Sequence, residues 1–382
     1  MLRVGIITIQ KSSNYGACLQ CYALYKYIES LGYDCEIIDL HRPGVKHQKY
    51  CSSKRFKPSR YSIKKNLVER LRSLFGKAIE KKYPRSAIRM SKIHDFNNQM
   101  NYSRPYEGPD DLYDNPPEYD IYISGSDQLW NPTMKFCVEP YFLTFVPKGS
   151  KKISYATSIG VDSLQEKEIQ NYKEWLSDYT SISVREKTAQ SFLTAFVNTR
   201  IEQVLDPSFL LSKDEWLSFC VSPKISKPYI LLFTLEYSET LLEYAKNLKE
   251  ESGLELVYLC WRQPIDSFGE YIVEREAGIE DFIGYIKGAS LVITNSFHGT
   301  VFSLILETSN FFVYVGQSKR SSRIVDMLSK FSISDHVIEQ LGLPYVVLSE
   351  RVINYQEIHK TMQVEIERSR EFIKASLLKC NF

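Results

Sequence analysis

The chain has 382 residues, of which 43% are hydrophobic and 25% are charged, a composition typical of globular proteins and a length that suits two domains. Its formal net charge is only +2. No basic region precedes a cleavable apolar segment, and no apolar run approaches the roughly 18 residues that a membrane helix needs. We therefore expect neither a signal peptide nor a transmembrane helix, and a cytoplasmic location.

The first predicted elements form a β-α-β unit. An apolar strand is expected at residues 3–9, a helix at 16–31 that Gly32 ends, and a second strand at 35–40. Two of the eight cysteines, Cys18 and Cys21, have CxxC spacing, but no second pair follows at zinc-site spacing. Both lie in the apolar helical pattern, which favours buried small side chains over a redox or metal role.

Positive charge is concentrated in residues 44–112, a predicted insertion or lid that interrupts the β/α pattern. Residues 46–104 hold 17 Lys or Arg and 3 Asp or Glu, a charge of +14 against −12 for the remaining chain. The pattern predicts an amphipathic helix at 63–82 with one basic face. Such a block can attract a phosphate-rich partner or an anionic membrane surface, or it can be only a solvated insertion. No nucleic-acid-binding signature accompanies it.

Two successive β/α series indicate an α/β fold with two Rossmann-like domains facing a cleft. The first series has further strands at 119–124, 152–156 and 181–184 and closes at 204–207, and a connection is expected at 212–227. The second has strands at 229–233, 256–260 and 291–294, with helices at 241–252, 280–288 and 300–306. We predict domains at residues 1–211 and 228–348 and a C-terminal helical segment at 349–382.

The most informative segment follows the strand at 291–294, where a polar turn holds Ser296, His298, Gly299 and Thr300. The amides of Gly299 and Thr300 are expected at a helix N-terminus, which favours phosphate, and Gly299 permits close approach of a ligand. His298 can exchange a proton near neutral pH. The alternative is a histidine that only caps a loop.

A second polar segment follows the strand at 119–124. Ser126, Asp127, Gln128 and Asn131 can bind hydroxyls there, and Trp130 can stack on a sugar face. Asp127 can orient or deprotonate a sugar hydroxyl. The alternative is that Asp127 caps a helix and Trp130 packs in the core.

Three further segments supply anion-binding candidates. Arg185 directly follows the strand at 181–184, and its guanidinium can pair with a carboxylate or phosphate or with a nearby acid. Asn14, Tyr15 and Gly16 follow the first strand, where Asn14 can cap the next helix, but the G-x-G-x-x-G pattern of dinucleotide sites is absent. The remaining two candidates are Arg320 and Arg323, for which a solvated surface is the alternative.

Taken in order, these segments resemble the polysaccharide pyruvyl transferase family. The matching stretches cover roughly residues 1–45 and 118–330 and include "NYGACLQ", "YISGSDQLWNP", "SVREK", "VLDPSFLL" and "ITNSFHGTVFSLI". The resemblance implies a two-domain fold like that of the GT-B glycosyltransferases. The histidine of the family motif falls on His298 and its arginine on Arg185. Some members have a second arginine two positions before the histidine, where this chain has Ser296, and Arg320 or Arg323 would supply that charge instead.

The resemblance also implies a reaction, the formation of a pyruvate ketal on a sugar with phosphoenolpyruvate as donor and release of phosphate. The expected roles are anion binding for Arg185 and the amides of Gly299 and Thr300, proton transfer for His298 and acceptor binding for Asp127. Residues 1–211 form the expected acceptor side and residues 228–348 the donor side. No metal or other cofactor is required.

The expected acceptor is a precursor of a cell-surface polysaccharide, such as a capsule or exopolysaccharide, carried on a lipid. Peripheral contact with the inner face of an anionic membrane follows from the basic block. Two other functions stay open, a GT-B-type nucleotide-sugar glycosyltransferase and a non-catalytic module that binds glycans or phosphate.

Overall fold

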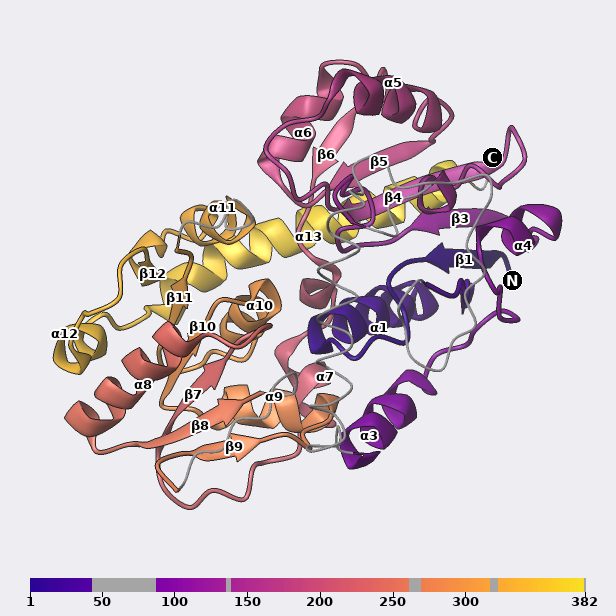
Figure 1. Ribbon diagram of the computed structural model, residues 1–382. Helices are drawn as coiled ribbons and strands as arrows, with labels where there is room; N and C mark the ends of the chain where they lie inside the picture. The colour runs from indigo at the N-terminus through magenta and orange to yellow at the C-terminus, as the bar shows by residue number, and fades with distance from the viewer. Residues whose placement is uncertain (43–86, 135–138, 261–268, 317–321, 381–382) are drawn as a thin grey trace. The chain divides into compact units, whose positions relative to one another are not determined.

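The computed structural model describes residues 1–42, 87–134, 139–260, 269–316 and 322–380 (Figure 1). The chain divides into two compact units. Unit 1 comprises Met1–Lys65, Asn97–Leu211 and Gln363–Phe382, and unit 2 comprises Asn66–Phe96 and Ser212–Met362. The predicted helix at 63–82 and most of the basic block lie outside the described residues. The expected cleft between the two units stays a prediction.

Unit 1 is built on a six-stranded parallel sheet in the order β2-β1-β3-β4-β5-β6. Most of its central strands are buried on both faces, which is why they appear in the sequence as continuous apolar runs. The strands are β1 (Arg3–Ile7), β2 (Asp34–Ile37), β3 (Ile121–Ser124), β4 (Lys151–Thr157), β5 (Ser181–Val184) and β6 (Ile201–Gln203).

The helices of unit 1 connect successive strands. Asn14 caps α1 by accepting a hydrogen bond from the Gly16 amide at 3.0 Å, as the sequence predicts. Cys18 and Cys21 are fully buried in α1, which confirms their interpretation as small core side chains. The elements are α1 (Tyr15–Ser30), α4 (Pro109–Asp114), η1 (Glu139–Phe142), α5 (Glu166–Trp175), α6 (Lys187–Thr194) and η2 (Pro207–Leu210).

Unit 2 holds a second six-stranded parallel sheet in the order β12-β11-β10-β7-β8-β9. Counted from its own first strand, this is the 3-2-1-4-5-6 order of Rossmann domains that bind dinucleotides. The strands are β7 (Tyr229–Phe233), β8 (Glu255–Leu259), β9 (Ile272–Glu274), β10 (Leu291–Thr294), β11 (Phe311–Tyr314) and β12 (Val337–Ile338).

Helices cover this sheet as well, and α3 joins them through an ion pair between Lys92 and Asp281 at 2.7 Å. The helix expected at 300–306 begins earlier, at Phe297, because Ser296 caps it. The helices are α3 (Ala87–Asn97), α7 (Lys213–Leu217), α8 (Glu239–Ser252), α9 (Ile279–Gly288), α10 (Phe297–Ile305), α11 (Ser322–Lys330), η3 (Ser334–His336) and α12 (Tyr345–Glu350).

The last helix, α13 (Tyr355–Lys379), contributes to both units. In unit 2, the Tyr355 hydroxyl donates a hydrogen bond to the carbonyl of Thr308 at 2.7 Å. In unit 1, the Ser369 hydroxyl accepts from the Leu205 amide at 3.0 Å, and Arg370 donates to the carbonyl of Leu210 at 2.7 Å. α13 is therefore divided between the two units. Across the described ranges, no helix combines the length and apolar character needed to cross a bilayer.

Candidate functional sites at the strand ends

In unit 1, the order of the sheet reverses between β1 and β3, because β2 lies on one side of β1 and the later strands lie on the other. Crevices at such a point, beyond the carboxyl ends of the strands, are where open α/β sheets bind ligands. Here the Thr8 hydroxyl, just after β1, donates a hydrogen bond to the carbonyl of Ser126 at 3.1 Å. A Cβ on Gly125 would lie 3.0 Å from that of Thr8, so a larger residue would require the two strand ends to shift slightly apart.

Asp127 follows β3 in a left-handed backbone conformation, with a φ of 75°. Its carbonyl accepts hydrogen bonds from the amides of Leu129 and Ser158, at 2.8 and 2.9 Å. Ala156, on the neighbouring strand β4, also has a positive φ, of 50°, next to a register shift between β4 and β5. Strained residues that cluster at strand ends are a common feature of functional sites.

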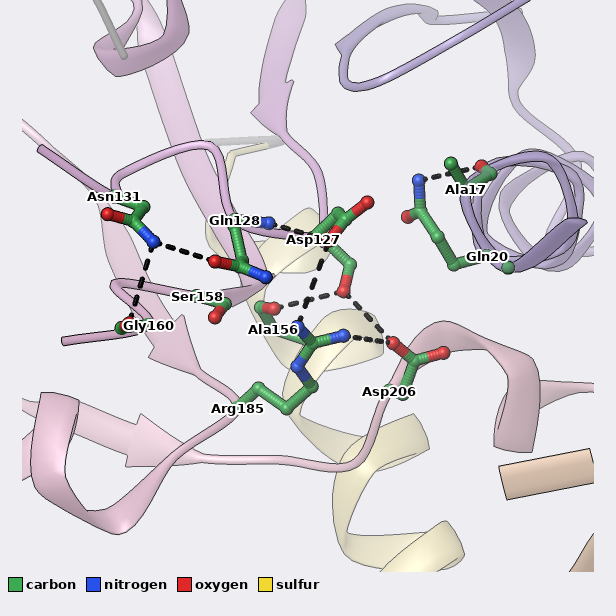
Figure 2. A network of polar contacts seen from close by, with 12 residues as sticks. Ala17, Gln20, Asp127, Gln128, Asn131, Ala156, Ser158, Gly160, Arg185 and Asp206 are labelled. Atoms are coloured by element: carbon green, nitrogen blue, oxygen red, sulfur yellow. Dashed lines mark hydrogen bonds and ion pairs between the residues drawn. The ribbon is translucent and has the colours of Figure 1, made fainter. Parts of the chain in front are cut away.

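Arg185 extends from the end of β5 toward two carboxylates, and Figure 2 shows its guanidinium between Asp127 and Asp206. The Arg185 Nη1 donates to Asp206 Oδ2 at 2.7 Å, and Nη2 lies 4.0 Å from Asp127 Oδ1. The side chain of Arg185 is 3% exposed and that of Asp206 is 0% exposed. This is a buried, charge-assisted pair.

Asp206 is not among the predicted site residues. It caps η2, where its Oδ1 accepts from the amide and the hydroxyl of Ser208 at 3.0 and 2.7 Å. The Ser126 hydroxyl lies 3.3 Å from Asp206 Oδ2 and 3.0 Å from the carbonyl of Ala156, so its single proton is shared between them. The Asp-Pro pair after a strand was the available signal, since Asp is a frequent cap before a proline.

Burial lowers the pKa of Arg185, but the carboxylates of Asp206, Glu186 and Asp127 outweigh burial and raise it above its ordinary value. Glu186 is itself buried, and its Oε1 forms a short hydrogen bond with the Ser158 hydroxyl. Its Oε2 has no hydrogen-bond partner among the described residues. The cluster therefore contains one guanidinium and three carboxylates.

Gln128 and Asn131 form a polar network beside Asp127 (Figure 2). The Asn131 amide donates to Gln128 Oε1 at 2.6 Å and lies 3.5 Å from the carbonyl of Gly160. Gly160 has a φ of 63°, and a Cβ there would lie 2.6 Å from Gln128 Oε1. The network keeps the loop after β3 close to the loop after β4.

Trp130 does not face a ligand, and the expectation that it stacks on a sugar is wrong for this conformation. Its side chain is 0% exposed and stacks on Phe142, with ring centroids 5.1 Å apart. Its indole N–H donates to the carbonyl of Tyr141 at 3.0 Å. The alternative from the sequence, a tryptophan packed in the core, describes it.

In unit 2, the sheet order reverses between β7 and β10, and the segment with His298 follows β10. The Leu235 amide after β7 donates to Asn295 Oδ1 at 3.4 Å, which ties the two strand ends together. The Thr294 hydroxyl donates to the carbonyl of Phe233 and accepts from the Ser296 amide, at 2.7 and 3.0 Å. His298 thus lies at the place in the sheet where a ligand is expected.

The hydrogen bonds of Ser296 contradict the anion site that the sequence predicts at the start of α10. It is the N-cap of α10, and its hydroxyl accepts from the Gly299 amide at 3.3 Å. Its carbonyl accepts from the Thr300 amide at 3.0 Å and from the Thr300 hydroxyl at 2.9 Å. The amides of Gly299 and Thr300 are therefore bonded within the chain, so they do not form the open phosphate site that the sequence predicted.

Gly299 has a packing role instead of a ligand role. A Cβ on it would lie 2.6 Å from the Thr294 hydroxyl oxygen and 3.0 Å from a ring carbon of Phe233. The space that a ligand was expected to use is filled by β10 and β7. Thr300 is also fully buried.

His298 and Arg323 both contact the ring of Phe297. The His298 ring makes an edge contact with Phe297, with centroids 5.2 Å apart, and the guanidinium carbon of Arg323 lies 5.4 Å from the centroid of the same ring. Arg323 is thus placed near the start of α10, whereas Arg320 lies outside the described residues. His298 belongs to unit 2 and Arg185 to unit 1, so their convergence on one ligand stays a prediction.

Tyr15 and Gly16 are buried at the start of α1. A cavity of about 510 Å³ lies at the starts of β5 and β6 against α13, where Ser181, Glu202 and Arg368 line it, and it includes none of the predicted site residues. Within the described ranges, no three His, Cys, Asp or Glu side chains are grouped so that they could hold a metal ion.

Two Rossmann-like sheets with polar groups at their reversal points define an α/β class that known proteins share. The model of the family described as polysaccharide pyruvyl transferase matches residues 14–317, most of the chain. The chain therefore belongs to the polysaccharide pyruvyl transferase family, as the motifs indicate, and is an enzyme of that family. No curated protein matches the sequence.

Solved structures with little sequence identity share the fold. UGT89C1 of Arabidopsis thaliana, solved with UDP-L-rhamnose, superposes with a TM-score of 0.54 at 12% identity and 99% coverage of both chains. A putative UDP-N-acetylglucosamine 2-epimerase from Listeria monocytogenes has a TM-score of 0.51 at 10% identity and covers 95% of this chain and 91% of its own. These similarities confirm the predicted α/β, GT-B-like fold with its two Rossmann-like sheets.

Proposed function

We propose that this enzyme uses phosphoenolpyruvate to form a pyruvate ketal on one sugar of a cell-surface polysaccharide precursor. The observation that supports this most directly is the position of His298. It lies at the start of α10, at the reversal point of the sheet in unit 2, and it contacts Phe297, whose ring also contacts Arg323. A proton-exchanging group and a cation that contact the same ring suit an anionic donor that must gain a proton.

The donor is assigned to unit 2. The start of α10 is the positive end of a helix dipole, and no acidic residue stands in its first turn to neutralise it. Arg323 adds a guanidinium, which can pair with a phosphate or carboxylate. Phosphoenolpyruvate carries both anionic groups, so this region supplies favourable charge without the amides of Gly299 and Thr300.

The acceptor is assigned to unit 1. Asp127 is partly accessible, with its side chain 16% exposed, and its Oδ1 already accepts from the Gln128 amide at 2.8 Å. Its second carboxylate oxygen can accept the hydrogen bond of a sugar hydroxyl. The strained backbone holds that carboxylate at the end of β3, where a ligand is expected.

The proposed reaction uses two neighbouring hydroxyls of one sugar. The first attacks C2 of the donor while the methylene carbon gains a proton and becomes a methyl group. The bond between C2 and the phosphate oxygen then breaks, the second hydroxyl forms the other C–O bond, and the ketal closes. The two hydroxyls lose two protons in total. One is balanced by the proton that the methyl group gains, and the other leaves with phosphate. His298 exchanges the proton at the methylene carbon, and Asp127 accepts one from a hydroxyl.

The acceptor that we propose is carried on a lipid at the inner face of a membrane. The support is the charge of +14 in residues 46–104. Replacing Lys64, Lys65, Lys81 and Lys82 by Gln should weaken binding to vesicles that contain anionic lipid at low salt, and salt should weaken binding of the unmodified protein. If the variant and the unmodified protein bound such vesicles equally, the proposed membrane contact would be wrong.

A donor screen tests the function. The protein is incubated with acceptors that contain galactose or mannose, and with either phosphoenolpyruvate or nucleotide sugars. We expect phosphate release and a product heavier by one pyruvate less one water, only with phosphoenolpyruvate. Release of a nucleotide, with a glycosylated product, would instead establish a nucleotide-sugar glycosyltransferase. Donor binding without any product would indicate a binding module.

A histidine variant with a matched control sharpens the screen. His298→Gln should lower kcat by about 10²-fold or more, as expected for loss of a general acid or base. His359→Gln is the control. His359 lies on α13, its Nε2 is 2.8 Å from Glu307 Oε1, and it has no expected catalytic role. Equal activity of both variants would contradict the role of His298.

A further inference from the structure

The cavity of unit 1 is separate from the polar groups at the strand ends. Its volume of about 510 Å³ falls within the range of small-molecule pockets, roughly 300–1,000 Å³. Ser181, on its wall, is the first residue of β5, and Arg185 follows the last. Four steps of about 3.3 Å along a strand separate these two residues by about 13 Å. A ligand in the cavity would therefore not occupy the site around Asp127.

The walls of the cavity come from β5, β6 and α13, in parts that all belong to unit 1. The strand β6 has only three residues and forms the edge of the sheet. Opposite it, α13 contributes the short side chains of Ala375 and Ser376, which leave space beside the edge strand. The hydrogen bonds of Ser369 and Arg370 to the segment after β6 hold the helix against unit 1. The cavity is thus part of the folded unit.

Hydroxyl groups make up a large part of the lining. Ser181 is 5% exposed, and its Oγ has no hydrogen-bond partner among the described residues. A buried hydroxyl without a partner is unfavourable, so we expect a group in the cavity, either a ligand or a water that it holds, to supply one. The hydroxyl residues of the lining are Thr180, Ser181, Thr199 and Ser376.

The rim of the cavity carries charges of both signs. Glu202 pairs with two guanidiniums, through Oε1 with Arg200 Nε at 2.5 Å and through Oε2 with Arg368 Nη2 at 3.3 Å. Ion pairs of such exposed arginines are weak, so these guanidiniums can also donate to a ligand. Glu371 and Lys379 add one further charge of each sign. A strongly charged ligand would meet like charge here, whereas a neutral polar ligand would not.

Apolar surface completes the lining. Phe372 lines the cavity from α13, and its ring centroid lies 6.4 Å from that of the buried Tyr155. Val204 adds apolar surface from the segment after β6. A few polar groups beside aromatic and aliphatic surface are typical of small-molecule sites. A sugar ring fits this lining, because its faces are apolar and its hydroxyls can donate to carboxylates and accept from guanidiniums.

We propose that this cavity is a second saccharide-binding site, which holds a sugar of the glycan other than the one that receives the ketal. The glycan as the source of that sugar rests on the proposed function, whereas binding of a saccharide in the cavity requires no catalysis. A long glycan bound at two places is held more tightly than through the reacting sugar alone, because the second contact becomes intramolecular. The cavity therefore favours long acceptors over single sugars.

Saturation-transfer NMR with disaccharides of galactose or mannose, in the absence of phosphoenolpyruvate, measures the binding. Ala375→Trp should weaken it by about tenfold or more, because the indole occupies the cavity. Lys374→Trp is the matched control, since Lys374 is the exposed neighbour on α13 and does not line the cavity. Equal binding by the two variants, or no binding of either disaccharide by the unmodified protein at up to about 10 mM, would overturn the proposal.

Two serines of β5 give an independent result. Ser181→Ala should weaken binding of the disaccharide by about threefold, because the ligand loses one hydrogen-bond partner. The Ser183 hydroxyl, by contrast, donates to the carbonyl of Ser154 at 3.0 Å. Ser183→Ala should therefore lower the melting temperature and leave binding unchanged. Equal affinities of the two variants would overturn the site, and this pair keeps the proposal testable where Ala375→Trp does not fold.

Ketal formation separates a glycan site from a structural role. With an acceptor of eight sugars, Ala375→Trp should raise KM by about fivefold at unchanged kcat, and with a single-sugar acceptor it should change neither. An equal rise in KM for both acceptors would overturn the second site. Light scattering tests for pairing of two copies through the cavity, and a dimer that Ala375→Trp separates would also overturn it.

The proposed function fails in a different way. Absence of any product from phosphoenolpyruvate with the unmodified enzyme would overturn the proposed function, while the NMR titration would still decide whether the cavity binds a saccharide.

Discussion

The strand ends of the two sheets differ in charge, although both sheets are parallel and reverse their order at one point. In unit 1, three carboxylates surround one buried guanidinium after β3, β5 and β6. In unit 2, hydroxyl groups and a helix cap shape the end of β10, and the guanidinium of Arg323 contacts Phe297 at the start of α10. The same architecture thus offers hydrogen-bond acceptors in one unit and positive potential in the other, which suits a hydroxyl substrate and an anionic substrate respectively.

The two regions also differ in backbone strain. Asp127 and Ala156 have φ values of 75° and 50°, whereas Ser296 caps α10 with an ordinary φ of −96°. Strain of this kind persists only where the surrounding contacts enforce it. The surrounding contacts therefore fix the backbone at Asp127. The position of His298 at the start of α10 depends on the Ser296 cap and on tight packing around Gly299.

The largest expected effect is on kcat, when the Asp127 carboxylate of unit 1 is removed. Asp127→Asn should lower kcat by about 10²- to 10⁴-fold, because Asn cannot accept a proton. Asn tolerates the left-handed conformation, so the fold should be retained. Steady-state kinetics together with calorimetric titration of phosphoenolpyruvate measure both quantities. A variant with unchanged kcat, or one that no longer binds the donor, would show that Asp127 does not serve the acceptor.

Substitutions of Trp130 test whether the sugar binds away from this side chain. Trp130→Ala should destabilise unit 1 by about 3–5 kcal/mol, because it opens a cavity against Phe142. Trp130→Phe should cost less and leave the acceptor KM unchanged. Urea unfolding and acceptor kinetics provide the test. Normal stability combined with a large rise in the acceptor KM would restore the sugar-stacking interpretation.

Gly299 tests the packing of the histidine side. Gly299→Ala should destabilise unit 2 by about 1–3 kcal/mol, since the new methyl group would lie 2.6 Å from the Thr294 hydroxyl. The measurement is chemical unfolding, with Gly253→Ala as a comparison site. Gly253 has open space but a φ of 72°, so its cost comes from strain alone. Weaker donor binding at full stability would instead indicate direct ligand contact at Gly299.

The smallest expected effect concerns the cap of α10. Ser296→Ala should cost about 1 kcal/mol of stability, because the Gly299 amide loses its side-chain partner. Ser296→Asp should retain the cap but weaken donor binding, because it adds a negative charge at the helix start. Thermal unfolding and donor titration distinguish the two changes. Tighter binding of phosphoenolpyruvate by the Asp variant would contradict an anion site in this region.

Much of the architecture could be predicted from the sequence. The apolar runs at β1, β3 and β10 are long enough to identify buried parallel strands, and Asn14 before a helical pattern identifies the cap of α1. The strands β6, β9, β11 and β12 were not predicted. Three of them have only two or three residues, too few to show a periodic pattern, and β11 is a four-residue apolar run that periodicity alone does not assign to a strand.

The details of the candidate sites were harder to predict because they depend on side-chain partners. Nothing local distinguishes Arg185 facing a ligand from Arg185 paired with Asp206, which is 21 residues away. Likewise, "SFHGT" is compatible with open amides or with a Ser296 cap, and only the three-dimensional arrangement decides between them. Trp130 packs on Phe142, and an aromatic residue beside polar ones gives no sign of that partner.

Hydrogen exchange in the presence of phosphoenolpyruvate alone tests the central claim most directly. The account predicts slower exchange in peptides that cover residues 291–305, and unchanged exchange at residues 121–131 until an acceptor sugar is added. Protection confined to residues 121–131, or no protection anywhere, would contradict a donor site at the start of α10.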